Sequence, residues 1–217
     1  MSDPAIDTLV GRLTPVKPLQ AAALWRGAAL AVVVAAVYVA ILYGMRPELR
    51  ILTQPMLMHR PMILLKPILF LLLGISALRG VAELARPEGR LRFRVLLPAL
   101  LLFGAVLGVF IRDVTVYGWA KTFHNAFGAA PLCAMTILCG GTVGVILMWR
   151  FWLRRSATSH PVQLGAMSGL SAASLMAGAY AIHCNMDAAV YLLLVYGLAV
   201  AVFTGLSALV GRKLYRW

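Results

Sequence analysis

The sequence is poor in charge and in reactive side chains. Only 12% of the 217 residues are charged, and 7 residues are Asp or Glu. These acids lie near the ends of apolar stretches or between them, so the interior row of carboxylates that a proton-coupled transporter uses is missing. None of the 4 histidines falls in the middle of an apolar stretch. Paired histidines inside a helical bundle, which a bound haem would need, are therefore not indicated.

The motifs of common enzyme classes are also missing. The sequence contains no C-x-x-C thiol pair, no glycine-rich phosphate loop, no H-E-x-x-H zinc motif and no evident Ser-His-Asp set. It shows no internal repeat of the kind that builds many transporters, and no strand-like alternation of apolar and polar residues. We therefore expect a protein that is not an enzyme and that carries no cofactor.

What the sequence has in abundance is apolar side chain. Hydrophobic residues make up 62% of the chain, and the mean hydropathy is +0.88. Its apolar stretches have the length that a helix needs to cross the roughly 30 Å hydrocarbon core of a bilayer. We predict an all-α polytopic membrane protein with an N-terminal segment (1–25), a transmembrane domain (26–211) and a basic tail (212–217). The domain is predicted to be a bundle of six transmembrane helices, at about 27–45, 62–83, 94–112, 129–149, 163–184 and 188–210.

The net charge of +13 is distributed unevenly between the two sides of such a bundle. Most of the 20 Lys and Arg residues fall on the side that holds both termini. Because basic residues accumulate on the cytoplasmic side, both termini are predicted to be cytoplasmic in a bacterial inner membrane. The basic residues then indicate the topology and an interaction with anionic membrane lipids. They do not indicate direct binding of nucleic acid. The opposite side holds Arg46, Arg50, Arg60, Lys66, Arg112 and Lys121.

The N-terminal segment contains one short amphipathic pattern. Ile6, Leu9, Val10 and Leu13 follow i, i+3, i+4 and i+7 spacing, which places them on one face of a helix. Two interpretations stay open at this point. The helix lies on the inner leaflet of the membrane, or its apolar face docks into a groove on a soluble partner.

Lys66 lies about a turn inside the start of the second predicted span. It either extends to the membrane interface or makes a polar contact inside the bundle. The first outer link is predicted at about 46–61. The stretch 55–62 there combines three methionines with His59, which could hold a soft cation but is more typical of a turn at the membrane edge. Gly165 and Gly169 have the small-xxx-small spacing that lets membrane helices approach closely.

The three cysteines fall in two groups. Cys133 opens the fourth predicted span and Cys184 closes the fifth, so both are expected at the outer face on consecutive helices. They could form a disulfide, a redox switch or part of a soft-metal site, with His183 as a neighbour that could assist. Cys139 lies about 9 Å deeper and is rotated by about 240°, so it faces elsewhere. We interpret Cys139 as a small buried apolar residue.

Several of these residues together resemble a known family, the NrsF-like membrane anti-sigma factors of proteobacteria. The most specific match is the Tyr-Ala-x-His-Cys ending at Cys184, with Cys133 upstream. Two departures are the sequence after Cys184, which reads Asn-Met-Asp, and Val195-Tyr196, where the family has Trp-Tyr. The other matches are Leu-x-Pro-Val at 13–16, Lys66, Arg-Pro-x-Gly at 86–89, Pro161 with Gly165, and the tail at 212–217.

The resemblance implies a negative regulator that holds an extracytoplasmic-function sigma factor at the inner membrane. It also implies that Cys133 and Cys184 sense oxidants or heavy metals from the outer face. The face formed by Ile6, Leu9, Val10 and Leu13 is then the candidate sigma-binding surface. The alternatives are a small membrane transporter or channel and, less well supported, a membrane thiol oxidoreductase.

Overall fold

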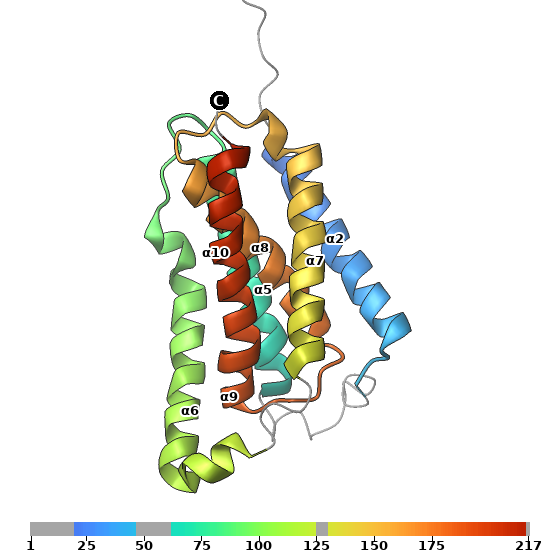
Figure 1. Ribbon diagram of the computed structural model, residues 1–217, viewed down its shortest axis with the longest axis vertical. Helices are drawn as coiled ribbons and strands as arrows, with labels where there is room; N and C mark the ends of the chain where they lie inside the picture. The colour runs from blue at the N-terminus through green and yellow to red at the C-terminus, as the bar shows by residue number, and fades with distance from the viewer. Residues whose placement is uncertain (1–19, 47–61, 125–129, 216–217) are drawn as a thin grey trace, which may run out of the picture.

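A computed structural model describes residues 20–46, 62–124 and 130–215. Over these residues the chain is helical and contains no strand. Consecutive long helices run antiparallel and form one bundle (Figure 1). The long helices are α2 (Ala21–Leu42), α5 (Met62–Leu84), α6 (Leu97–Phe123), α7 (Ala130–Phe151), α8 (Pro161–Tyr180) and α10 (Leu198–Leu214). The shorter ones are η1 (Phe93–Leu96), η2 (Leu153–Arg155), α9 (Ala189–Tyr191) and η3 (Leu192–Gly197), and α9 and η3 lead directly into α10.

The prediction of an all-helical fold is confirmed over the described residues, with one difference in the number of strongly apolar helices. Five helical stretches of the described chain are long and apolar enough to cross a membrane: 21–42, 62–84, 93–123, 130–155 and 189–214. The sixth predicted span, α8, is not among them. Its serines and small residues lower its apolarity, and the structure explains why this is tolerated. Nearly all of α8 is buried among its neighbours, so its surroundings are protein, which accepts small and hydroxyl-bearing side chains.

Helix α8 lies at the centre of the bundle, against α5, α7, α10 and α2 (Figure 1). Two of its buried hydroxyls donate to backbone: Ser168 to the Leu164 carbonyl oxygen at 2.7 Å and Ser171 to that of Gly74 at 3.0 Å. The predicted close approach at Gly165 and Gly169 is confirmed. A Cβ atom built on Gly165 would lie 2.5 Å from the Ser207 carbonyl oxygen of α10. The absence of side chains there lets α8 and α10 touch backbone to backbone.

Helix α6 is longer than the predicted span 94–112. The segment after Arg112, which we expected to be a link, stays helical as far as Phe123, with a break at Gly118. Gly118 has φ +79°, a conformation that glycine adopts without steric cost. Beyond it the ring of Trp119 stacks on Phe123, with centroids 5.5 Å apart. The helix therefore continues to Phe123, past the charged residues Arg112 and Asp113 that interrupt its apolar run, and aromatic side chains pack together along this last part.

The two ends of the bundle differ in chemistry. One end, called the basic end here, holds Gln20, the links 85–92 and 152–160, and the end of α10 (Figure 1). The described chain therefore begins and ends at the same end of the bundle. The opposite end, called the thiol end, holds the last turn of α2, the first turns of α5 and α7, and the link 181–188 after α8.

Candidate functional site

Cys133 is positioned by the first turn of α7, at the thiol end. Three residues at four-residue spacing, Cys133, Ile137 and Gly141, form the buried stripe of this otherwise exposed or half-buried helix. The thiol is 1% exposed. The rotation of α7 that packs Gly141 against α8 and α10 therefore also turns Cys133 into the bundle.

Cys184 lies in the link that follows α8. After Tyr180, the backbone N–H groups of His183 and Cys184 both donate to the Tyr180 carbonyl oxygen, at 3.0 and 3.3 Å. This tight turn folds the link back over the end of the helix, so Cys184 is only 5% exposed. The sulfur atoms of Cys133 and Cys184 lie 3.8 Å apart, and both thiols are free. The expectation that they arrive at the same end of adjacent helices agrees with this geometry.

Tyrosine hydroxyls surround the thiol pair. The Tyr191 hydroxyl donates to the Cys133 sulfur at 2.9 Å, and the Cys133 thiol donates to the Tyr180 hydroxyl oxygen at 3.7 Å. Tyr191 and Tyr196 are five residues apart, which in an α-helix would separate them by about 140° around the axis. The stretch between them is a π-helix, whose i→i+5 hydrogen bonds bring residues five apart onto the same face. Their rings accordingly lie 6.1 Å apart, both facing the site.

Lys66 completes the site from α5. Its side chain is 1% exposed, so it makes its contacts inside the bundle. The ammonium group donates to the carbonyl oxygens of Cys184 and Met186, at 3.3 and 3.1 Å. It also lies 4.4 Å from the ring centroid of Tyr196, a cation–π contact. A buried ammonium needs such partners, and here they fasten the link to α5.

The electrostatic surroundings favour ionisation of Cys184, which lies beyond the end of α8. The hydrogen bond with Cys133 and the positive charge of Lys66 hold the pKa of the Cys184 thiol below its ordinary value, although burial acts in the opposite direction. Because the thiolate is the form that attacks oxidants and binds metals, this arrangement makes Cys184 the more reactive member of the pair.

The same link is fastened to the end of α2. Arg46 makes two side-chain hydrogen bonds to Asp187, at 2.9 and 2.6 Å, and its backbone N–H donates to the Ile182 carbonyl oxygen at 3.2 Å. The His183 Nδ1 atom lies 3.0 Å from the carbonyl oxygen of Gly44. The link that carries Cys184 is thus held on two sides, by α5 through Lys66 and by the residues after α2 through Arg46 and Gly44.

The remaining predicted site residues fall in different places. His183 faces Gly44 and the rings of Tyr43 and Tyr180, at 5.3 and 5.6 Å between centroids, and so contacts the end of α2. The interpretation of Cys139 as a buried residue is wrong. It is exposed, because a rotation of about 240° from Cys133 places it on the outer side of α7. The candidate sigma-binding residues (Ile6, Leu9, Val10 and Leu13) and the methionine-rich segment at 55–62 lie outside the described residues, apart from Met62.

Five residues of the site were not among the site residues predicted from the sequence: Tyr180, Tyr191, Tyr196, Arg46 and Asp187. A signal existed for the charged pair, because Arg46 and Asp187 are isolated charges next to apolar stretches on the same side. Opposite charges at one membrane face are natural partners. For Tyr191 and Tyr196 there was no such signal, since their shared direction depends on the π-helix.

The arrangement permits two kinds of thiol chemistry. A disulfide requires the sulfur atoms to approach from 3.8 Å to about 2.05 Å, which is a small movement of a link. Two thiolates are also ligands for soft metal ions. Within the described part of the chain, no group of three or more His, Cys, Asp and Glu side chains gathers to hold a metal. The two thiols are therefore what this site offers to a soft ion.

Comparison with known proteins identifies one family. A family model described as negative regulator of sigma F matches residues 9–217, which is nearly the whole chain. Comparison with curated proteins and comparison with solved structures each found no match. The matched region includes every residue of the site described above.

Proposed function

The chain belongs to the family of negative regulators of sigma F, NrsF, and we propose that it is an inner-membrane anti-sigma factor controlled by its thiol pair. In this proposal it holds an extracytoplasmic-function sigma factor at the cytoplasmic face of the membrane, away from RNA polymerase. Oxidant or a heavy-metal ion reacts with Cys133 and Cys184 from the periplasmic side, and the sigma factor is released. The family match supports the negative regulation, and the geometry of the thiol pair supports the control.

The proposed orientation places the basic end in the cytoplasm. Exposed arginines concentrate there, and the positive-inside rule relates such concentration to the cytoplasmic side. The thiol end then faces the periplasm, which is kept oxidising in bacteria. The two ends of the bundle would thus correspond to the two tasks of the protein, partner binding at one and sensing at the other.

The sigma factor is proposed to bind the N-terminal segment, residues 1–25, through the face formed by Ile6, Leu9, Val10 and Leu13. Residues 21–25 of this segment already belong to α2, which begins at Ala21 at the basic end, earlier than the predicted span 27–45. The indole N–H of Trp152 donates to the Gln20 carbonyl oxygen at 3.1 Å and so fixes the start of α2 against α7. Any movement of α2 would therefore reach the proposed binding segment directly.

One observation carries the proposal: the link that bears Cys184 is bonded to the residues that end α2. Closing a disulfide or binding a metal draws Cys184 toward Cys133 and α7. Arg46, through Asp187, and Gly44, through His183, pass this displacement to α2. Helix α2 is suited to respond, since only Leu24 and Val39 of its 22 residues are buried. A helix with few buried side chains can shift at low cost in packing.

The switch requires two packings of the bundle, because a signal acts only through its different free energy in two states. Moving such an equilibrium from about 1:99 to 99:1 requires roughly 5.5 kcal/mol. A covalent S–S bond or a pair of metal–thiolate bonds can supply a difference of this size, whereas a single neutral hydrogen bond, at about 1 kcal/mol, cannot. Reaction at the thiols is therefore the step on which release depends.

The test is co-purification of the tagged, detergent-solubilised protein with sigma factors from cells that express them, before and after adding diamide or Cu(I). We expect an extracytoplasmic-function sigma factor to co-purify with the untreated protein and to be released on treatment. Cys133→Ser and Cys184→Ser should retain the sigma factor under both conditions. Cys139→Ser is the matched control, and it should behave as the unaltered protein does because Cys139 is exposed on the far side of α7.

Three outcomes would contradict parts of this proposal. If no sigma factor co-purifies, the anti-sigma role is wrong. If the sigma factor is retained after the thiols have reacted, the sensing role is wrong and the binding role stands. If the cysteine variants lose the sigma factor without treatment, the thiols hold the binding conformation and do not act as a sensor alone.

A further inference from the structure

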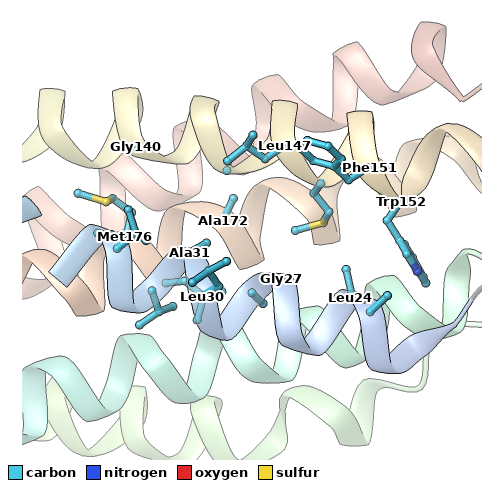
Figure 2. A pocket seen from close by; sticks show the side chains of 18 residues that line it. Leu24, Gly27, Leu30, Ala31, Gly140, Leu147, Phe151, Trp152, Ala172 and Met176 are labelled. Atoms are coloured by element: carbon cyan, nitrogen blue, oxygen red, sulfur yellow. The ribbon is translucent and has the colours of Figure 1, made fainter. Parts of the chain in front are cut away.

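An apolar groove lies between α2 and the helices that it packs against. It has a volume of about 390 Å³ and lies between α2, α7 and α8 (Figure 2). Every residue that lines it is apolar, including Gly27 and Ala31 of α2, Gly140 and Leu147 of α7, and Ala172 of α8. Small residues of α2, Gly27 among them, leave this space open. A Cβ atom built on Gly27, for example, would have no heavy atom within 4 Å.

The groove opens onto the outer surface of the bundle. Leu30 and Leu147, which line it, are 65% and 43% exposed, and Phe151 at its basic end is 73% exposed. Both α2 and α7 belong to the stretches long and apolar enough to cross a membrane. The opening therefore lies at the depth of the lipid tails. An extended hydrocarbon chain is the ligand class that matches an apolar groove running along two membrane helices.

Two arginines flank the groove at its basic end. Arg26 follows Ala23 by three positions and precedes Leu30 by four, so it lies on the same side of α2 as these two lining residues. Arg150, in the last turn of α7, has its guanidinium carbon 5.9 Å from the ring centroid of Phe151. Both arginines are exposed, and neither α2 nor α7 contains an Asp or Glu. The field at this end of the groove therefore favours an anion.

We propose that the groove binds one acyl chain of an anionic phospholipid, whose phosphate head group lies between Arg26 and Arg150. The hydrocarbon chain fills the space beside Gly27 and Ala31, and the two guanidinium groups contact the phosphate. This lipid completes the packing of α2, which buries few of its own side chains. The proposal concerns lipid binding alone and does not depend on the sigma factor.

The experiment uses the full-length protein in phosphatidylcholine vesicles. A small fraction of the lipid is phosphatidylglycerol with a diazirine in its acyl chain, and a parallel sample contains the same diazirine chain on phosphatidylcholine. After illumination, mass spectrometry locates the cross-linked peptides. We expect phosphatidylglycerol to cross-link residues 23–35 and 140–152 above all other segments, and phosphatidylcholine to label these segments much less.

Matched variants separate the two halves of the site. Gly27→Leu fills the groove, whereas Gly104→Leu makes the same change on α6, where a Cβ atom also has open space. Gly27→Leu should reduce labelling of both segments to the level of the surrounding helices, and Gly104→Leu should not change it. Arg26→Gln and Arg150→Gln should each lower the preference for phosphatidylglycerol by about fivefold. Arg112→Gln, an exposed arginine at the other end of the bundle, should not.

Each contrary result overturns the proposal. Labelling spread evenly around the bundle would mean that α2 and α7 meet bulk lipid only. Equal labelling by the two head groups would remove the role of the arginines. Labelling that survives Gly27→Leu would place the acyl chain elsewhere. Because Gly→Leu can disturb folding, the arginine variants, which change only exposed side chains, test the proposal independently.

Discussion

The guanidinium group of Arg46 pairs with the carboxylate of Asp187 through two parallel hydrogen bonds, at 2.9 and 2.6 Å. The residues are 141 positions apart in the sequence. This pair joins the end of α2 to the link that carries Cys184, and it is held in a largely buried setting, with side chains 2% and 20% exposed. Two-pronged contacts of this kind fix geometry as well as charge.

The Arg46–Asp187 pair makes a prediction about stability. Asp187→Asn leaves the buried guanidinium without this carboxylate and should lower the free energy of unfolding by about 2 to 4 kcal/mol, allowing for the partial exposure of Asp187. The double variant Arg46→Met/Asp187→Leu removes both charges and should cost about 1 kcal/mol. Denaturant unfolding in detergent measures both. A double variant less stable than the single one would show that the pair itself is strongly stabilising.

The same double variant also tests the proposed transmission of the signal. With Arg46 and Asp187 both apolar, the link keeps its contacts with Lys66 but loses its charged connection to α2. We expect sigma binding to persist and release on oxidation to be reduced, because only the His183–Gly44 contact and the Arg46 backbone N–H still join the link to the residues after α2, although Cys133 and Cys184 still react. Co-purification before and after diamide, with thiol counting in the same samples, gives the answer. Normal release from this variant would mean that α2 is not reached through Arg46.

Lys66 is predicted to control the reactivity of Cys184. Its charge helps to hold the pKa of Cys184 below the ordinary value, so the thiolate persists at pH values where a free thiol is protonated. The labelling rate of Cys184 by a small methanethiosulfonate should then change little between pH 6 and pH 8. In Lys66→Met the pKa rises, and the rate should increase about tenfold per pH unit below that pKa.

The control for Lys66→Met is Lys121→Met, which removes an exposed lysine from the same half of the bundle. Its pH profile should match that of the unaltered protein. Peptide mass spectrometry reads the modification at Cys184 alone. A flat profile in Lys66→Met would show that the lysine fastens the link without affecting the thiol.

The close contact between α8 and α10 makes a prediction about Gly→Ala substitutions. The change should lower stability at Gly165, inside the contact, but not at Gly104 on α6. Gly165→Ala places a methyl group 2.5 Å from the Ser207 carbonyl oxygen and 2.8 Å from the Gly211 Cα. Backbone must move to accommodate it, so we expect a loss of about 1 to 3 kcal/mol in stability. Gly104→Ala, which has open space on α6, should be neutral or gain about 0.5 to 1 kcal/mol. Thermal unfolding in detergent should separate the two; equal midpoints would argue against close α8–α10 contact.

Much of the fold follows from the sequence because membrane thickness fixes helix length. An apolar run of about twenty residues marks a span, and the predicted runs agree with α5, α7 and α8 to within a few residues. The shared level of Cys133 and Cys184 follows from the same reasoning, since antiparallel neighbours bring the start of one helix beside the end of the other. Both predictions depend only on how far along its helix axis each residue lies, which the sequence gives directly.

Side-chain direction around each helix could not be predicted in the same way. In a membrane both the lipid and the bundle interior accept apolar side chains, so the sequence gives little sign of which face is buried. This is why Cys139 was interpreted as buried although it is exposed. The site also depends on the π-helix between Tyr191 and Tyr196, a local change of hydrogen bonding without a clear sequence signature.

The most direct test of the central claim follows thiol state and sigma binding together in one sample. The purified complex is treated with diamide, and at each time point the Cys133–Cys184 disulfide peptide and the retained sigma factor are both quantified. Our account predicts that sigma is released with the same time course as the disulfide forms, and that Cys139→Ser leaves both curves unchanged. Complete formation of the disulfide with the sigma factor still bound would contradict it.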